Sequence, residues 1–186
     1  MAEKKRSILT SATLIAAVML LSKLLGFARQ VVIASAFGSG GETDLYFVSS
    51  DFMISLSGAL LSALSTALIA RYIEIAVKDS RRAANAVASQ MLSLFLLIGA
   101  ACILLIDVFA PQIGRVLAPA VSEENAAQLV HYLRFFSITF IFTAFQSIYA
   151  SVLNANDRFV PGKLYGIVYN PIAIGCVLFL SGRYGI

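Results

Sequence analysis

Long apolar runs recur along the whole chain and are separated by short polar stretches. The runs cover residues 8–37, 45–70, 86–110, 129–153 and 164–181. A helix rises about 1.5 Å per residue and the hydrocarbon core of a bilayer is about 30 Å thick, so about 20 residues span it. The fifth run is slightly short, and the other four are long enough. The pattern predicts an all-α polytopic membrane protein in which residues 1–186 form a single transmembrane domain of about five helices.

The composition excludes most soluble classes. Of the 186 residues, 59% are hydrophobic and 13% are charged, whereas a soluble domain carries about 25% charged residues. The net charge of +4 is not gathered on a polar segment with interleaved aromatic residues, so a nucleic acid partner is not expected. Cys102 and Cys176 lie inside apolar runs and give neither metal-ligand spacing nor a disulfide framework.

The distribution of basic residues predicts the orientation of the helices. Most of them fall on the side of the membrane that holds the N-terminus: Lys4, Lys5, Arg6, Arg71, Lys78, Arg81, Arg82, Arg158 and Lys163. The opposite side has only Arg115 and Arg183. Because cytoplasmic loops retain Lys and Arg, we expect a cytoplasmic N-terminus in the inner membrane and outward loops at 38–43 and 111–128.

The basic start, the first apolar run and Ala34-Ser35-Ala36 also resemble a cleavable signal peptide. Lys23 and Arg29 lie between the apolar run and that site, which a cleavable signal does not normally allow. The first helix is therefore kept as a membrane span.

Four ionisable residues lie within the predicted spans: Lys23, Arg29, Asp51 and Arg134. A charge near the bilayer centre costs about 2.5–3.5 kcal/mol on insertion scales and persists mainly where it faces protein or water. Arg29, Asp51 and Arg134 lie about 8–12 Å below the outer ends of their helices and share a layer. One interpretation is an Arg29–Asp51 ion pair with two snorkelling cations. We favour a cationic cavity, since three cations against one carboxylate leave a positive charge that an anionic ligand completes.

The second predicted helix carries a polar face. Asp51, Ser55, Gly58, Ser62 and Ser65 follow steps of four, three, four and three, so they lie on one side and are candidates to line the cavity. Gly58, Ser62 and Thr66 also fit a small-residue seam that lets two helices approach closely. The two interpretations stay open here.

Two helices are expected to be irregular. Gly26 lies within a first helix of about 45 Å, which predicts a bend or break there. Pro171 frees the carbonyl of Ile167 in the fifth helix. Gly26 and Pro171 are therefore candidate hinges.

Enzyme chemistry is not expected. There is no nucleophile with a nearby base, no Walker loop and no metal-ligand cluster, so we predict neither an enzyme nor a cofactor. His131 is interpreted as interfacial, and Asp107 as solvated at an outer helix end.

Several short motifs follow one another along the chain in an order and spacing typical of one known family. They are 22–29 (SKLLGFAR), 36–38 (AFG), 43–44 (TD), 109–111 (FAP), 117–119 (LAP) and 152–154 (VLN) with Arg158-Phe159 and Pro161. This series resembles the MviN/MurJ family of lipid II flippases over nearly the whole chain.

The resemblance implies a substrate, a mechanism and a set of site residues. The fold would be two six-helix lobes around a cavity that alternates between the two sides, with this chain forming most of the first lobe. The substrate would be an undecaprenyl-diphosphate-linked sugar, in the family a peptidoglycan precursor. Lys23 and Arg29 match cavity cations of the family, Asp44 its Thr-Asp pair, and Arg134 a basic position of the fourth helix.

One departure leaves the substrate open. The family's second helix typically has an early proline and a pair of arginines followed by an acidic residue, which 51–62 (DFMISLSGALLS) lacks. A different headgroup, such as an exopolysaccharide precursor, or a drug exporter of the same superfamily stays an alternative. A non-transporting membrane interaction protein is another. Residues 181–186 read as a loop about to enter a further helix, so we expect a second lobe beyond residue 186 or another copy as partner.

Overall fold

The described part of the chain is helical throughout, as the apolar runs predict. The computed structural model describes residues 2–38, 40–119 and 121–184, with only the backbone described for 2–12, 163, 180 and 182–184. Within these residues there is no strand. The side chains of the basic N-terminal residues, Lys163 and Arg183, on which part of the predicted orientation depends, lie outside the described ones.

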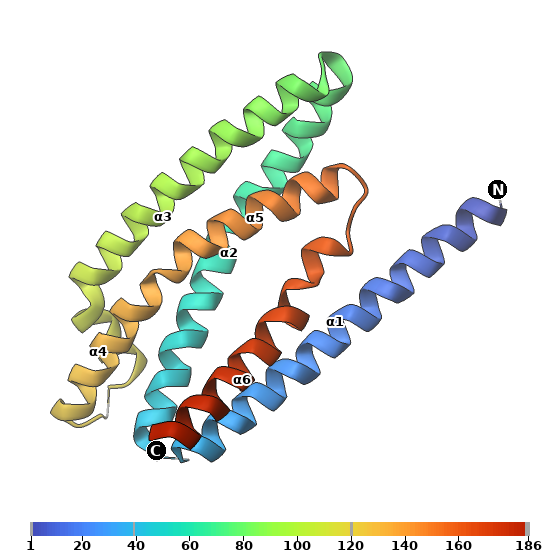
Figure 1. Ribbon diagram of the computed structural model, residues 1–186. Coiled ribbons are helices and arrows are strands. Elements are labelled where there is room, and N and C mark those ends of the chain that lie inside the picture. The colour runs from blue at the N-terminus through green and yellow to red at the C-terminus, as the bar shows by residue number, and fades with distance from the viewer. Residues whose placement is uncertain (1, 39, 120, 185–186) are drawn as a thin grey trace. The chain divides into compact units, whose positions relative to one another are not determined.

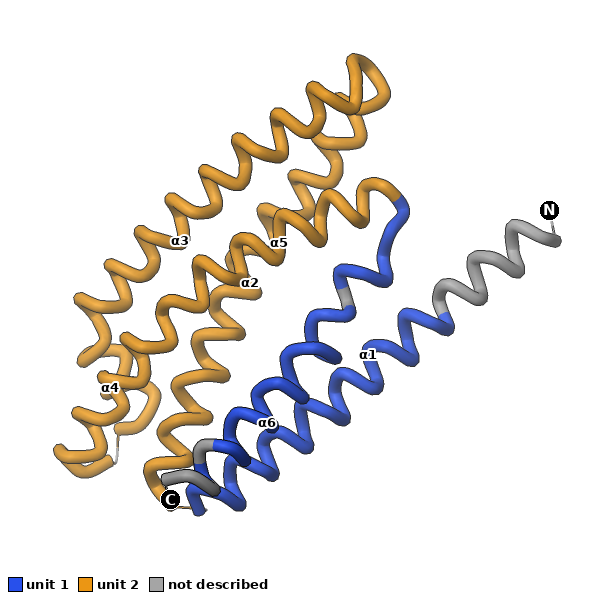
Figure 2. The backbone as a smooth tube through the Cα atoms, in the orientation of Figure 1, with its two compact units in different colours: residues 1–39, 157–186 blue, residues 40–156 orange. Residues whose placement is uncertain are grey.

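The chain divides into two compact units (Figure 2). Unit 1 holds residues 1–39 and 157–186, and unit 2 holds residues 40–156. The single transmembrane domain over residues 1–186 stays a prediction.

Unit 2 is a bundle of long rods (Figure 1). Its helices are α2 (Gly41–Lys78), α3 (Arg81–Leu117), α4 (Glu123–Ser137) and α5 (Thr139–Ala155). Helix α3 runs antiparallel to α2, and α4 and α5 follow one another back along both. The bundle therefore has three rods, the third made of two helices.

The core of unit 2 consists of three apolar clusters. One joins Leu45 and Met53 to residues of α3, α4 and α5, and a second surrounds Phe95. The third lies beside the α2–α3 turn and contains Tyr72. Their side chains come from all the rods, so the clusters hold the bundle together by packing rather than by ion pairs.

Helices α2 and α3 are longer than the apolar runs alone predict. The Ser80 hydroxyl caps α3 by accepting a hydrogen bond from the Ala83 N–H at 3.2 Å, and the Ser122 hydroxyl caps α4 through the Asn125 N–H at 3.4 Å. The predicted loop at 111–128 is wrong, because α3 continues through Pro111 to Leu117 and α4 begins at Glu123. Hydropathy predicts the part of a helix that lies in lipid, whereas capping residues determine where the helix begins or ends.

A one-residue break divides the predicted helix 129–153 into α4 and α5. It falls at Ile138, between two residues with hydroxyl groups. The Ser137 hydroxyl donates to the Arg134 carbonyl at 2.6 Å, and the Thr139 hydroxyl donates to the Phe136 carbonyl at 2.7 Å. Such back-bonding competes with the backbone ladder and often bends helices.

Unit 1 consists of α1 (Ala2–Phe37), the short 3-10 helix η1 (Pro161–Lys163) and α6 (Tyr165–Tyr184). Helices α1 and α6 pack together and run in the same direction (Figure 1). The break predicted as one possibility at Gly26 does not occur, because α1 is uninterrupted there, and α6 continues through Pro171.

Within the described residues, four helical segments are long and apolar enough to cross a membrane. They are Thr13–Phe37, Gly41–Lys78, Arg81–Leu117 and Glu123–Ala155. A shorter apolar helix follows at Tyr165–Phe179, where the sequence predicts a slightly short fifth span. The all-α, multi-pass class is therefore confirmed.

Tyr72 offers a test of the packing at the α2–α3 turn. Its buried hydroxyl donates to Asn85 Oδ1 at 2.7 Å and accepts from Asn156 Nδ2 at 3.4 Å, which links α2, α3 and the end of α5. We expect Tyr72→Phe to destabilise the protein by about 1–2 kcal/mol, since it removes both hydrogen bonds that the buried hydroxyl makes. The melting midpoint of purified protein should fall by about 2–8 °C. Tyr149→Phe, at an exposed tyrosine of α5, should leave the midpoint unchanged, and equal midpoints for both variants would contradict the linking role of Tyr72.

Candidate functional site

Arg29 lies against an aromatic pair on the neighbouring helix. Its guanidinium carbon is 5.2 Å from the centre of the Tyr169 ring on α6, within the range of a cation–π contact. Tyr169 in turn stacks on Tyr165, with ring centres 5.5 Å apart and an interplanar angle of 9°. The aromatic pair therefore gives the Arg29 cation a polarisable partner within unit 1.

The hydrogen-bonding capacity of Arg29 is not used up. The side chain is half-buried, and its Nε atom is buried without a hydrogen-bond partner in the described part of the chain. A guanidinium carries five N–H donors, and an unpaired one in an apolar region is costly. An anionic ligand would supply the acceptors that Tyr169 cannot. Lys23, six residues earlier on α1, is exposed.

The close approach of α6 to α1 depends on Gly166. A Cβ at this position would clash with the Ser22 hydroxyl and lie 3.1 Å from the Ser22 Cβ. Asn170, one turn further along α6, donates from Nδ2 to the Ser22 carbonyl at 3.2 Å and to the Gly166 carbonyl at 2.7 Å. Gly26 faces the same amide, since a Cβ there would be 3.7 Å from Asn170 Nδ2. This crossing fixes the part of α6 that presents Tyr169.

The predicted polar face of α2 is open. Asp51, Ser55, Gly58 and Ser62 are exposed and Ser65 is half-buried, so α3, α4 and α5 leave this face uncovered. The Ser62 and Ser65 hydroxyls donate to the carbonyls four or three residues earlier on their own helix. Asp51 has no ion pair with the described residues of unit 2. Its predicted pairing with Arg29 stays a prediction.

A second row of α2 hydroxyls is buried, and the sequence reading missed it. Ser49 and Ser57 are fully buried, and Ser57 Oγ lies 3.4 Å from Thr143 Oγ1 of α5. Their spacing along α2 resembles that of the exposed face. Periodicity alone therefore could not predict which of the two rows packs against the other helices of unit 2. Within unit 2, the small-residue seam of α2 is this buried row, and Gly58 and Ser62 are on the open one.

Arg134 provides the hydrogen-bond donor that α3 lacks at Pro111. Pro111 has no N–H, so the carbonyl of Asp107, four residues earlier, loses its helical partner. Arg134 of α4 donates to that carbonyl from Nε at 3.3 Å and from Nη2 at 3.2 Å. The interpretation of Asp107 as solvated is wrong: it is half-buried ten residues before the end of α3, and its Oδ1 is buried without a partner in the described residues.

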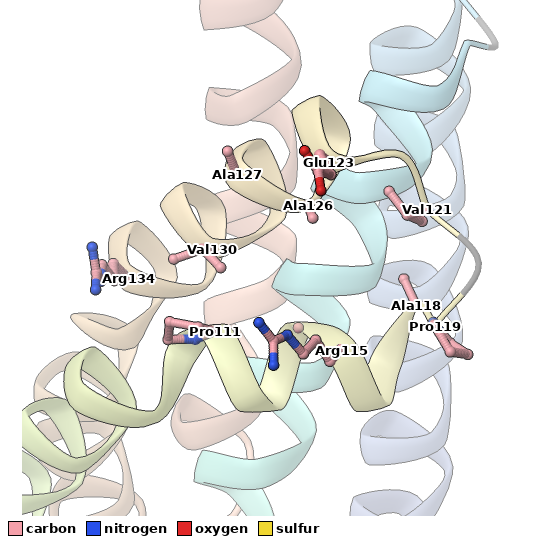
Figure 3. Close-up of a pocket in the computed structure, with 11 residues that line it drawn as sticks. Pro111, Arg115, Ala118, Pro119, Val121, Glu123, Ala126, Ala127, Val130 and Arg134 are labelled. Atoms are coloured by element: carbon pink, nitrogen blue, oxygen red, sulfur yellow. The ribbon is translucent and has the colours of Figure 1, made fainter.

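Beside this contact, the end of α3 and helix α4 enclose a groove (Figure 3). Its volume is about 630 Å³, and 11 residues line it. Arg115 and Pro111 lie on α3, and Arg134 lies on α4 close to Pro111 in this view. Glu123 is the acidic residue of the lining. This groove could not be predicted from hydropathy, because it depends on the continuation of α3 past Pro111.

The remaining predicted site residue, Asp44, is exposed in the first turn of α2. Its backbone N–H donates to the Gly40 carbonyl at 3.2 Å, and a carboxylate there complements the positive end of the helix dipole. Within each unit, the structure thus brings Arg29 to the α6 tyrosines and Arg134 to α3. The assignment of Lys23, Arg29, Asp44, Asp51 and Arg134 to one substrate site stays a prediction.

Long apolar helices that carry ionisable side chains within their length define a multi-pass membrane protein. Comparison with known families narrows this class. The sequence model described as lipid II flippase MurJ matches residues 33–186, so the chain belongs to this family.

Two curated relatives agree with this family. The chain is 30% identical over 181 residues to "Lipid II flippase MurJ" of Thermosipho africanus, covering 97% of this chain and 37% of that protein. It is 25% identical over 162 residues to "Probable lipid II flippase MurJ" of Thermotoga maritima, covering 84% of this chain and 33% of that protein. The chain thus spans about a third of the length of these relatives. No solved structure matches it.

Gly166→Ala tests the crossing that presents Tyr169 to Arg29. The added methyl must displace Ser22, so we expect a loss of about 1–2 kcal/mol in stability and a lower melting midpoint. Gly175→Ala on the same helix is the matched control, since a Cβ there meets nothing within 4 Å. A Gly166→Ala protein that melts with or above Gly175→Ala would show that the close approach is not needed.

Proposed function

We propose that this chain is the N-terminal part of a flippase that moves an undecaprenyl-diphosphate-linked sugar, such as lipid II, across the cytoplasmic membrane. Membership of the MurJ family supports a lipid-linked precursor as the substrate. The observation that carries the mechanism is Arg29, a half-buried cation on an apolar helix with a buried, unpartnered N–H.

The charge balance of the spans fits a diphosphate. Lys23, Arg29 and Arg134 are cations within membrane-spanning helices, and Asp51 is the carboxylate that the sequence places at similar depth. A diphosphate supplies several acceptor oxygens, which guanidinium groups bind through paired, charge-assisted hydrogen bonds. In this proposal Arg29 and Lys23 attract the diphosphate and Asp51 orients Arg29. Arg134, which already holds the Asp107 carbonyl, contributes its remaining donors.

The open face of α2 is proposed to line the path of the sugar. Ser55 and Ser62 expose hydroxyls beside Asp51 on a helix that is otherwise strongly apolar. Hydroxyl and carboxylate groups can exchange hydrogen bonds with a sugar. Because residues 51–62 replace the arginines expected from the resemblance, this face also favours a second candidate cargo, the lipid-linked precursor of another polysaccharide.

Alternating access requires parts that this chain does not supply alone. We propose that a second lobe completes the cavity, since the chain covers 37% of its Thermosipho relative. Gly26 and Pro171 are the proposed hinges, because a position without a Cβ and one without an N–H hold a helix less firmly. The N-terminus is proposed to be cytoplasmic, which places the α3–α4 end of unit 2 on the outer side.

Arg29→Ala should abolish transport without preventing membrane insertion. Loss of the hydrogen bonds to a charged ligand costs about 1.5–3 kcal/mol, so transport should fall at least about tenfold. The measurement is the flipping of a fluorescent undecaprenyl-diphosphate-linked sugar in vesicles that contain the full-length protein. Arg82→Ala is the control, since Arg82 is exposed at the start of α3 and should not affect the rate.

Normal flipping by a well-inserted Arg29→Ala protein would remove Arg29 from the mechanism. A wild-type full-length protein that neither flips the lipid nor binds a soluble prenyl diphosphate would instead favour the interaction-protein alternative. Flipping of another polysaccharide precursor in preference to lipid II would favour the second candidate cargo.

A further inference from the structure

The groove between the end of α3 and helix α4 has the dimensions of a ligand site. Its volume of about 630 Å³ lies within the range of about 300–1,000 Å³ that small-molecule sites occupy. It lies wholly within unit 2. Its lining begins in the last two turns of α3 and ends at Arg134, eleven residues into α4. A site at the end of a membrane-spanning helix lies near the headgroup region, where lipid phosphates are.

The groove has unused cationic donors. Arg115 is exposed and makes neither an ion pair nor a hydrogen bond with the described residues. Arg134 spends Nε and one Nη2 donor on the Asp107 carbonyl, which leaves three of its five N–H groups. Neither arginine forms a salt bridge with Glu123 in the part of the chain that the structure describes. Two guanidinium groups against one carboxylate leave a net positive charge in the groove.

The walls between the charges are apolar. Small side chains line them, among them Ala126, Ala127 and Val130 of α4. In Figure 3, Arg115 lies on the α3 side of the groove, and Arg134 lies on α4 near Pro111. An anionic group at the arginines with an apolar body against the alanines and valine is the chemistry of an anionic amphiphile.

We propose that this groove binds the phosphate of an anionic phospholipid headgroup from the adjacent leaflet. Arg115 and the free donors of Arg134 hold the phosphate oxygens, and the glycerol and upper acyl chain lie along the α4 wall. The bound lipid would also keep Arg134 in place against the Asp107 carbonyl, so it would support the α3–α4 contact. The groove shares Arg134 with the proposed cargo site, so the test depends on Arg115 and Glu123, which belong to the groove alone, and it does not depend on transport.

The test uses full-length, delipidated protein and short-chain dioctanoyl phosphatidylglycerol as the probe, with binding followed by native mass spectrometry. We expect Arg115→Gln to weaken binding about tenfold, since a pair of charge-assisted hydrogen bonds is lost. Glu123→Gln should tighten binding, because it removes the opposing charge. Arg82→Gln, an exposed arginine at the other end of α3, is the matched control and should leave binding within about twofold.

A second variant distinguishes weaker lipid binding from misfolding of the protein. Arg134→Lys keeps the charge but not the forked donors, so it should weaken the phosphatidylglycerol complex less than Arg115→Gln while the protein stays folded. Dioctanoyl phosphatidylcholine, which carries the phosphate without net charge, should bind more weakly than phosphatidylglycerol. Equal binding by wild type, Arg115→Gln and Glu123→Gln would overturn the proposal. Tighter, Arg115-dependent binding of farnesyl diphosphate than of phosphatidylglycerol would also overturn it, in favour of a site for the cargo.

Discussion

Every polar group inside an apolar helix of this protein must find a partner other than lipid, and this constraint explains most of the structure. A charged side chain at the centre of a bilayer costs about 2.5–3.5 kcal/mol on insertion scales, and a backbone carbonyl without a partner is also costly. The carbonyl that Pro111 frees is bonded by Arg134, and the Ser22 carbonyl is bonded by Asn170. The same requirement leaves Arg29, with its buried unpartnered N–H, as the position where a ligand is expected.

Units 1 and 2 meet this constraint in different ways. In unit 1, Gly166 removes a side chain so that α6 can approach Ser22, and the approach carries Tyr169 to the guanidinium of Arg29. In unit 2, serines of both α2 rows bond back to their own helix, and one row is also buried, with Ser57 beside Thr143. Packing thus decides which hydroxyls are covered by protein and which stay exposed.

Hydropathy alone predicted the all-α membrane class and four of the long apolar helices, because bilayer thickness sets the length of an apolar run. It predicted helix ends poorly: α3 continues past Pro111, and Arg134, more than twenty residues later in the sequence, donates to the Asp107 carbonyl in place of the missing proline N–H. Periodicity correctly placed Asp51, Ser55 and Ser62 on one face of α2. It could not predict that this face is exposed and that the face with Ser57 is buried. The short motifs around Lys23 and Arg29 predicted the family, and the family model agrees. The roles of these residues stay predictions, because hydropathy, spacing and packing do not identify the ligand that they would bind.

The most direct test of the account is whether water reaches the open face of α2. In a full-length protein with Cys102 and Cys176 replaced by alanine, Ser55→Cys and Ser62→Cys should react with a membrane-impermeant maleimide, and added substrate should slow the reaction. Leu60→Cys, exposed about half a turn away on the same helix, should stay unlabelled because lipid covers it and keeps its thiol protonated. If Ser55→Cys and Ser62→Cys both react no faster than the Leu60→Cys control, this face meets lipid or another helix. This outcome would contradict a water-filled path along α2.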